Sequence, residues 1–389
     1  MKEKASYTEL KKKALKAFKD KAEREAMCYS YAPGRVNIIG EHTDYNEGFV
    51  LPCAINFGTG IAAATNGTNK IRVWAPDMDD YDEFEISDSI EKHKTKVWSN
   101  YLRGLARLIT KEGHEFGGFD ALVTGNLPMG AGLASSASLE IAFANLINKA
   151  FSLGYQPQQL APLGQGAEAF TGSKCGIMDQ TASACGRKGH FLCIDCRDQS
   201  LRQIPIPLGL EIMIIDSNVT HQLVDGEYNG RRRQCESAAA KMNVKSLRDA
   251  NMEMLEAARD KMDDEEFRRA RHVITENERV LKAVNVLLNY DTASMSELMR
   301  LSHESMRDDF EITVKEIDEL QKIVTDALKG RGGVRMTGGG FGGSVVVLAL
   351  KQAIPDVTAA VNREYEKATG RKAKVMTTPA CSGARFENL

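Results

Sequence analysis

The glycine-rich segment at residues 125–138, GNLPMGAGLASSAS, has the composition of a phosphate-binding loop. It lies between an apolar run that predicts a strand ending at Thr124 and an apolar stripe that predicts a helix from about Ser138. Glycines let backbone amides converge on an anion, a helix N-terminus adds positive charge, and serine hydroxyls can donate to phosphate or bind a hard cation. The segment matches neither a Walker A loop nor the dinucleotide-binding pattern, and a plain turn with a serine N-cap is the alternative.

Residues 33–45, PGRVNIIGEHTDY, combine a short apolar run with hydrogen-bonding side chains on both sides. Arg35 precedes the run, and the consecutive polar residues 41–44 follow it. Such side chains suit a polyol, because carboxylates accept hydrogen bonds from hydroxyl groups while histidine and threonine can donate or accept. The alternative is an ordinary polar turn that is capped by Asp44 or Asn46.

Residues 332–344, GGVRMTGGGFGGS, contain seven glycines in thirteen positions between two apolar runs. Glycine weakens a strand, so its concentration here indicates a backbone that must approach something closely. We therefore expect a second loop on the phosphate side of the same site. A wide hairpin or a bulge is the alternative.

The elements that must position these segments are a mixture of strands and helices in both halves of the chain. Strands are predicted at 36–39, 49–55, 61–64, 71–74, 119–124, 191–194, 210–215, 334–337, 344–350 and 374–377. Helices are predicted at 8–21, 97–111, from 138 onward, 160–170, within 230–329 and at 356–369. The mixture predicts an α+β fold with a boundary near residues 205–210.

Composition limits the classes of partner. The formal net charge of −2 over 389 residues argues against a protein that coats nucleic acid or an anionic membrane. The longest apolar runs are far shorter than the roughly 20 residues of a bilayer span, and residues 1–25 lack the apolar stretch of a signal peptide. We expect a cytoplasmic protein whose eight scattered cysteines are reduced, and the Cys193 and Cys196 pair does not predict a zinc site.

Taken together, the three segments resemble those of galactokinases, a branch of the GHMP small-molecule kinase superfamily. The second and third segments mark the superfamily, and EHTDY at 41–45 marks the galactokinase branch. The similarity runs from about residue 32 to residue 370, and includes CGIMDQ at 175–180, GEYN at 226–229 with Arg232, and MRDDFE at 306–311. It implies two domains, residues 1–207 with a ribosomal-protein-S5-like fold and residues 208–389 with a ferredoxin-like fold. The active site would lie in the cleft between them.

The resemblance also implies an activity. Galactokinases transfer the γ-phosphoryl group of ATP to O1 of D-galactose, giving galactose 1-phosphate and ADP at the entry to galactose catabolism. The implied partners are D-galactose, ATP and Mg²⁺, in a monomer with no obligate protein partner. A kinase for N-acetylgalactosamine or galacturonate is one alternative, and a galactose- and ATP-binding sensor without catalysis is the other.

Site residues carry over position by position. Asp179 matches the family's catalytic base, and Arg35 matches its transition-state stabiliser. The galactose-binding positions are matched by Glu41, His42, Thr43, Asp44, Gly176 and Tyr228. The ATP-binding positions are matched by Trp74, Gly130, Ala131, Gly132, Leu133, Ala134, Ser135 and Ser136. The Mg²⁺ ligands are matched by Ser136 and Glu168. The chain departs from the family in having Ala134 at the first of three consecutive serines, and one residue fewer between Glu168 and Cys175.

Overall fold

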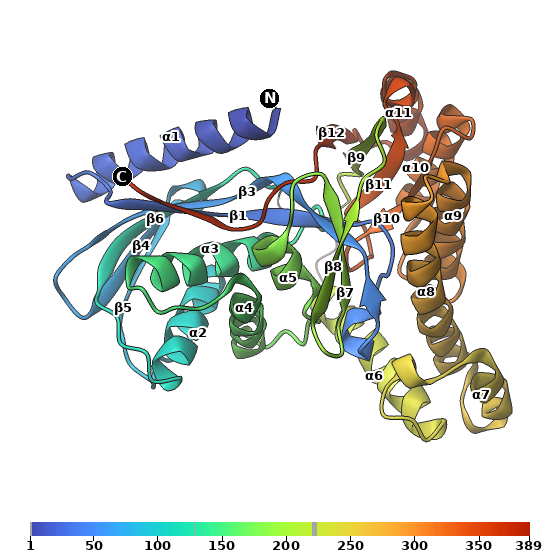
Figure 1. Ribbon diagram of the computed structural model, residues 1–389, viewed down its shortest axis with the longest axis horizontal. Helices are drawn as coiled ribbons and strands as arrows, with labels where there is room; N and C mark the ends of the chain where they lie inside the picture. The colour runs from blue at the N-terminus through green and yellow to red at the C-terminus, as the bar shows by residue number, and fades with distance from the viewer. Residues whose placement is uncertain (1, 129, 220–223) are drawn as a thin grey trace.

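The first half of the chain is built around a six-stranded sheet (Figure 1). The structure is a computed structural model, and it describes residues 2–128, 130–219 and 224–389. The strand order is β13-β1-β3-β6-β4-β5, and neighbouring strands are antiparallel except β4 and β6, which are parallel. The bounds are β1 (Cys28–Asn37), β3 (Pro52–Thr65), β4 (Lys70–Ala75), β5 (Asp80–Glu85), β6 (Phe119–Gly125) and β13 (Arg385–Asn388).

Helices cover both faces of this sheet. Along β3, Ala62 packs in one apolar cluster with Ala14 and Phe18 of α1, while its neighbour Ala63 packs in another cluster with the remaining helices. The alternation follows from the two-residue period of a strand. The helix bounds are α1 (Lys2–Ala22), α2 (Val97–Lys111), α3 (Ser135–Ala150), α4 (Pro157–Thr171) and α5 (Met178–Cys185). Figure 1 shows α1 alone on its side of the sheet, with α2, α3 and α4 opposite.

The second half contains a four-stranded antiparallel sheet with the order β10-β11-β9-β12. On β9, Met213 and Ile215 share an apolar cluster with residues of the surrounding helices, whereas Ile212 and Ile214 share one with Val36 of the first half. One face of this sheet therefore joins the two halves. The strands are β9 (Leu210–Asp216), β10 (Gly332–Thr337), β11 (Ser344–Leu350) and β12 (Lys374–Thr378). The helices are α6 (Val224–Lys241), α7 (Met252–Ala257), α8 (Asp264–Leu288), α9 (Thr292–Asp308), α10 (Lys315–Leu328) and α11 (Ile354–Thr369).

A third sheet lies at the junction of the halves. It pairs β2 (Phe49–Val50), β7 (His190–Asp195) and β8 (Ser200–Pro205) in that order. The expected boundary at residue 207 falls between β8 and β9, where the chain passes from this sheet to the four-stranded one. The last strand, β13, returns to the first half and pairs with β1. The division into 1–207 and 208–389 stays a prediction.

The predicted α+β class is confirmed, and several local expectations need correction. The strand expected at 36–39 is part of β1, which ends at Asn37 and contains Pro33 at a shift in register between Pro33 and Arg35. A register shift of this kind accommodates a proline that regular pairing would exclude. The edge strand β5, with the sequence DYDEFE, was not expected because its charged residues resemble a loop.

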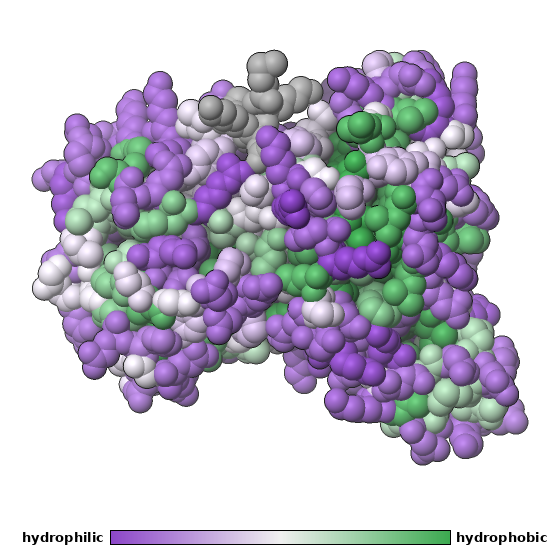
Figure 2. All heavy atoms as spheres, viewed as in Figure 1, coloured by the Kyte–Doolittle hydropathy of each residue, from purple (hydrophilic) through white to green (hydrophobic). Residues whose placement is uncertain are grey.

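Charged and polar side chains cover most of the face seen in Figure 2, where apolar residues reach the surface in small groups. Among the described residues, no helix has the combined length and apolar character that a membrane crossing needs.

Candidate active site

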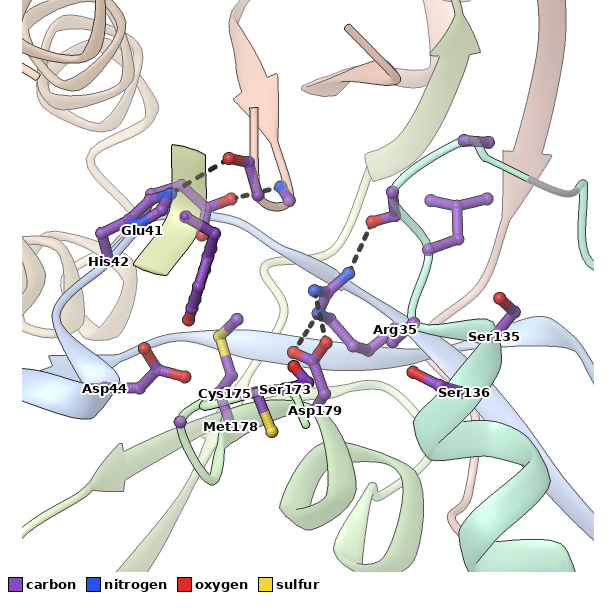
Figure 3. Close-up of a pocket in the computed structure, with 18 of the residues that line it drawn as sticks. Arg35, Glu41, His42, Asp44, Ser135, Ser136, Ser173, Cys175, Met178 and Asp179 are labelled. Carbon is purple, nitrogen blue, oxygen red and sulfur yellow. Dashed lines mark hydrogen bonds and ion pairs between the residues drawn. The ribbon is translucent and has the colours of Figure 1, made fainter. Parts of the chain in front are cut away.

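A cavity of about 260 Å³ lies between the two halves, with walls from both. The first half contributes residues around Arg35, and the second contributes Tyr228, Gly338 and Gly339. Most of the expected site residues line this cavity: Arg35, Glu41, His42, Asp44, Gly130, Ala131, Gly132, Leu133, Ala134, Ser135, Ser136, Gly176, Asp179 and Tyr228. Segments that are far apart in the sequence therefore converge on one place (Figure 3).

Arg35 and Asp179 form a two-pronged ion pair in the middle of the cavity wall (Figure 3). Nε and Nη2 of Arg35 each donate to a carboxylate oxygen of Asp179 at 2.7 Å. The third nitrogen, Nη1, donates to the carbonyl oxygen of Gly132 at 2.6 Å. Arg35 is buried, while the Asp179 side chain keeps 28% of its surface exposed. A fixed cation therefore joins a cavity-facing carboxylate to the phosphate loop, residues 125–138.

The phosphate loop presents backbone to the cavity. Gly130 and Gly132 have φ angles of 71° and 72°, a region that favours glycine. The loop ends at α3, whose first turn carries Ser135 and Ser136. Free N–H groups at a helix start, together with these hydroxyls, make a suitable anion site. At the departure from the family pattern, Ala134 has a φ of 60°, a conformation that costs energy for alanine.

The glycines of the third segment support the phosphate loop from behind. A β-carbon on Gly338 would lie 2.8 Å from the carbonyl oxygen of Gly132, and the Ser344 hydroxyl donates to the carbonyl oxygen of Ala131 at 2.8 Å. The two backbones meet because neither carries a side chain at Gly132 or Gly338. The expected second loop on the phosphate side is thus adjacent to the first.

The sugar turn, which we define as residues 40–49, forms the opposite end of the cavity. Glu41 is buried, and its two oxygens accept hydrogen bonds from Asn37 Nδ2 at 2.6 Å and from the Gly338 amide at 2.7 Å. His42 Nε2 lies 3.2 Å from the carbonyl oxygen of Gly339, and His42 Nδ1 lies 2.7 Å from the Tyr45 hydroxyl. Since a carbonyl only accepts, Nε2 carries the hydrogen. Burial lowers the pKa of His42 to about 3, so the ring is neutral at physiological pH.

Asp44 faces the cavity from the same turn. Its Oδ1 accepts from the Tyr45 amide at 2.9 Å. Burial, followed by the negative charge of Asp179, raises the pKa of Asp44 from 3.8 to about 7. A β-carbon on Gly176 would lie 1.9 Å from Oδ2 of Asp44, so only glycine fits where the loop before α5 crosses the turn.

Tyr228 reaches the sugar turn from α6 in the second half. Its ring centroid lies 5.0 Å from that of His42 and 5.3 Å from that of Tyr45. One helical turn later, Nη1 of Arg232 donates to the carbonyl oxygen of Lys174 at 2.9 Å. The second half thereby contacts both the turn and the loop that carries Gly176.

Three of the expected site residues are not among those that line the cavity. Thr43 is buried, and its hydroxyl donates within the sugar turn toward the carbonyl oxygen of Phe49 at 2.6 Å. Trp74 packs against Tyr81 and the apolar cluster under α1, on the far side of the sheet. Glu168 on α4 is buried, and its charge contributes to the raised pKa of Cys175, whose main cause is burial.

Sequence reasoning did not assign several lining residues. Gly338 and Gly339 belong to the third segment, whose glycine content was the available signal. Cys175 and Met178 flank Gly176 in the segment CGIMDQ, and Ser173 shortly precedes it. The resemblance of the segment CGIMDQ assigned roles only to Gly176 and Asp179, and an isolated serine such as Ser173 carries no pattern that marks a site.

The two-half fold and its glycine-lined cavity define the class of a GHMP small-molecule kinase. Family models for the GHMP kinase N-terminal and C-terminal domains match residues 100–187 and 284–367, and the galactokinase galactose-binding signature matches residues 16–65. The chain is 44% identical to galactokinases of Mannheimia succiniciproducens and Actinobacillus succinogenes, over 96% of this chain and 98% of each relative. The chain belongs to the galactokinase family.

Solved structures agree. Lactococcus lactis galactokinase complexed with galactose matches with a TM-score of 0.90 at 31% identity, covering 95% of this chain and 98% of that one. Methanococcus jannaschii mevalonate kinase shares the fold, with a TM-score of 0.66 at 16% identity over 94% of this chain and 99% of that one. The predicted family and GHMP fold are confirmed, and the protein is a sugar kinase, a phosphotransferase with ATP as co-substrate.

Proposed function

We propose that the protein transfers the γ-phosphoryl group of ATP to O1 of D-galactose, with Asp179 as the base and Arg35 as the stabilising cation. One observation carries this assignment, namely that Arg35 binds Asp179 with one edge and the Gly132 carbonyl with another. Phosphoryl transfer depends mainly on positioning and charge stabilisation. A cation that joins the proton acceptor to the phosphate loop meets both needs, and the exposed part of Asp179 remains available to a sugar hydroxyl.

The acceptor would bind between the sugar turn and Tyr228. Asp44 directs a carboxylate into the cavity, where it can accept hydrogen bonds from sugar hydroxyls. The neutral rings of His42 and Tyr228 form an apolar wall beside it. The named galactokinase relatives and the galactose-bound structure favour galactose over the alternatives of N-acetylgalactosamine, galacturonate or a sensor without catalysis.

The donor phosphates would bind at the phosphate loop and the first turn of α3. The loop fits ATP, because its lining is backbone with two serine hydroxyls. A hydroxyl at Ser136 and a carboxylate at Glu168 are oxygen ligands of the kind that Mg²⁺ prefers. Mg²⁺ bound there would neutralise phosphate charge. The proposed adenine contact of Trp74 has less support, because its ring packs on Tyr81 beneath α1.

Three finer expectations accompany the proposal. We place the domain boundary at residue 207, the protein in the cytoplasm, and the working form as a monomer. Size-exclusion chromatography with light scattering tests the last of these.

Asp179→Asn tests the assignment. Wild-type protein with ATP, Mg²⁺ and galactose should release ADP, and the variant should lose this activity by about 10³-fold or more. Galactose binding, measured by calorimetry, should persist, because the amide keeps the shape of the side chain. Asp198→Asn, on the loop between β7 and β8, is the matched control and should behave as wild type. ADP release that does not require galactose, or an active Asp179→Asn variant, would overturn the proposal.

A further inference from the structure

We infer that one face of α8 positions the sugar turn, and that Asn277 on this face is a positioning residue for galactose binding. The turn belongs to the first half of the chain and α8 to the second, so the contact crosses the junction. The inference rests on the proposed function, because it concerns the sugar site of that reaction.

Side chains of α8 hold both ends of the sugar turn by its backbone. At the entry, Glu276 Oε1 accepts from the Gly40 amide at 2.8 Å. At the exit, Asn277 Oδ1 accepts from the Phe49 amide at 2.9 Å. Glu276 and Asn277 are adjacent and buried, so one turn of α8 binds both the first and the last residue of the sugar turn.

A third contact lies between these ends. His272 Nε2 lies 3.1 Å from the carbonyl oxygen of Glu41, and His272 is fully buried. One turn beyond Asn277, Val280 packs so closely that a β-carbon on Gly40 would lie 2.9 Å from its Cγ2. His272, Glu276 and Val280 recur at intervals of four and share a face of α8, and Asn277 borders that face next to Glu276, so the turn rests on one side of the helix.

The Asn277 side chain packs tightly against the backbone at Gly48. A β-carbon on Gly48 would lie 2.3 Å from Asn277 Oδ1, closer than atoms can approach. Gly48 also donates its amide to the carbonyl oxygen of Thr43 at 2.8 Å inside the turn. The position of the Asn277 amide group therefore determines where the end of the turn lies.

The sugar turn needs such support because its backbone is strained. His42 and Glu47 have φ angles of 59° and 58°, in the left-handed region that side chains disfavour. Strained residues persist where the surrounding structure over-determines them. Both strained residues lie between Gly40 and Phe49, the two points that α8 binds. Their strain explains why the turn needs hydrogen bonds from α8 in addition to the internal hydrogen bond of Thr43.

The contacts between α8 and the sugar turn should affect the binding of galactose and leave the binding of ATP unchanged. The turn carries Asp44 and His42 into the cavity, whereas the phosphate loop is supported by Gly338 and Ser344 of the second half. Release of the Phe49 amide would let the turn shift or open, and small displacements of binding groups weaken binding selectively.

Asn277→Ala tests the inference by removing the acceptor for the Phe49 amide. We expect the galactose KM and the calorimetric galactose Kd to rise by about tenfold, while kcat and the ATP KM change by less than about twofold. Asn277→Asp, which keeps an oxygen at the same place, should restore most of the galactose affinity. Asn285→Ala, an exposed asparagine later on α8, is the matched control and should leave all four quantities unchanged.

These experiments distinguish a failure of the proposed function from a failure of the inference. A wild-type protein without galactose-dependent ADP release refutes the proposed function, whereas an active wild type with an unaffected Asn277→Ala variant refutes the inference alone. Parallel increases in both KM values, or an Asn277→Asp variant as weak as the alanine, would also refute it, because a general structural defect would explain them. If Asn277→Ala does not fold, Gly48→Ala displaces the same contact from the other side and should raise the galactose KM selectively. Wild-type galactose affinity in that variant would overturn the inference.

Discussion

The phosphate loop and the sugar turn are both supported by the second half of the chain, but by opposite means. At the phosphate loop, glycine backbone lies directly on glycine backbone, with Gly338 against Gly132. At the sugar turn, polar side chains of α8 accept hydrogen bonds from the backbone amides of the turn, as Asn277 does from the Phe49 amide. The phosphate loop requires glycine at the contact, because any side chain would collide. The sugar turn requires side chains that can accept hydrogen bonds.

This difference indicates how each region can change. A backbone contact has no side chain to adjust, so substitution at either glycine should disturb the nucleotide site directly. Side-chain contacts can be altered one at a time, so the sugar site can be tuned through residues that do not touch the sugar. Glu41 links the two regions, because it belongs to the sugar turn and accepts from the Gly338 amide.

Among the substitutions that test this difference between the two regions, Gly338→Ala should have the largest effect. Its φ of 93° disfavours a side chain, and a β-carbon would lie 2.8 Å from the carbonyl oxygen of Gly132. The phosphate loop must move, so kcat/KM for ATP should fall by about 100-fold, as measured by ADP release. Gly370→Ala is the control, because its φ is 73° but nothing lies within 4 Å of the added carbon. Equal losses in both variants would show that backbone strain alone is responsible.

A medium effect should distinguish Asp44 from Glu41. Asp44→Ala should raise the galactose KM by about 30-fold and leave the ATP KM unchanged, because its carboxylate faces the sugar end alone. Glu41→Ala should raise both KM values, because it also removes the acceptor for the Gly338 amide. Steady-state kinetics with each substrate varied in turn measures the split. A purely galactose-specific effect of Glu41→Ala would contradict the link between the regions.

The smallest effect concerns the stability of the sugar turn. The pKa of Asp44 is raised to about 7 by burial and by Asp179, so the folded protein holds this proton more tightly than the unfolded chain. The stability that this proton contributes is complete below pH 3.8 and is lost as the pH rises through about 7. Asp44→Asn cannot ionise, so without sugar its stability relative to wild type should increase by about 2–3 kcal/mol from pH 5 to pH 8. Urea unfolding at both pH values measures this, and a constant difference would show that Asp44 is not destabilising when charged.

Much of the fold follows from local patterns. The apolar stripe after Ser138 predicts α3, and the apolar run at 61–64 predicts part of β3, because the order of apolar and polar side chains reflects the local structure. The short α5 and the charged β5 escape such reasoning, since neither has an apolar period long enough to recognise. These elements are stabilised by neighbours that come from elsewhere in the chain.

The same limit applies to the candidate site. Its glycine-rich and polar segments are visible in the sequence, and resemblance assigned roles to Arg35 and Asp179. The residues that support the turn, such as Asn277, carry no motif, because an asparagine inside a long helix is ordinary. Trp74 packs with the apolar cluster beneath α1, and its expected place near the adenine stays a prediction.

By itself, the sequence determined the α+β class, the glycine-bearing loops and the identity of the groups that can do chemistry, because these depend on residue type and short spacing. Only the tertiary structure decided that Arg35 meets Asp179 across 144 positions and that α8 holds a turn more than two hundred residues earlier. Such contacts depend on the path of the whole chain, and hydrogen bonds act only over a few ångströms.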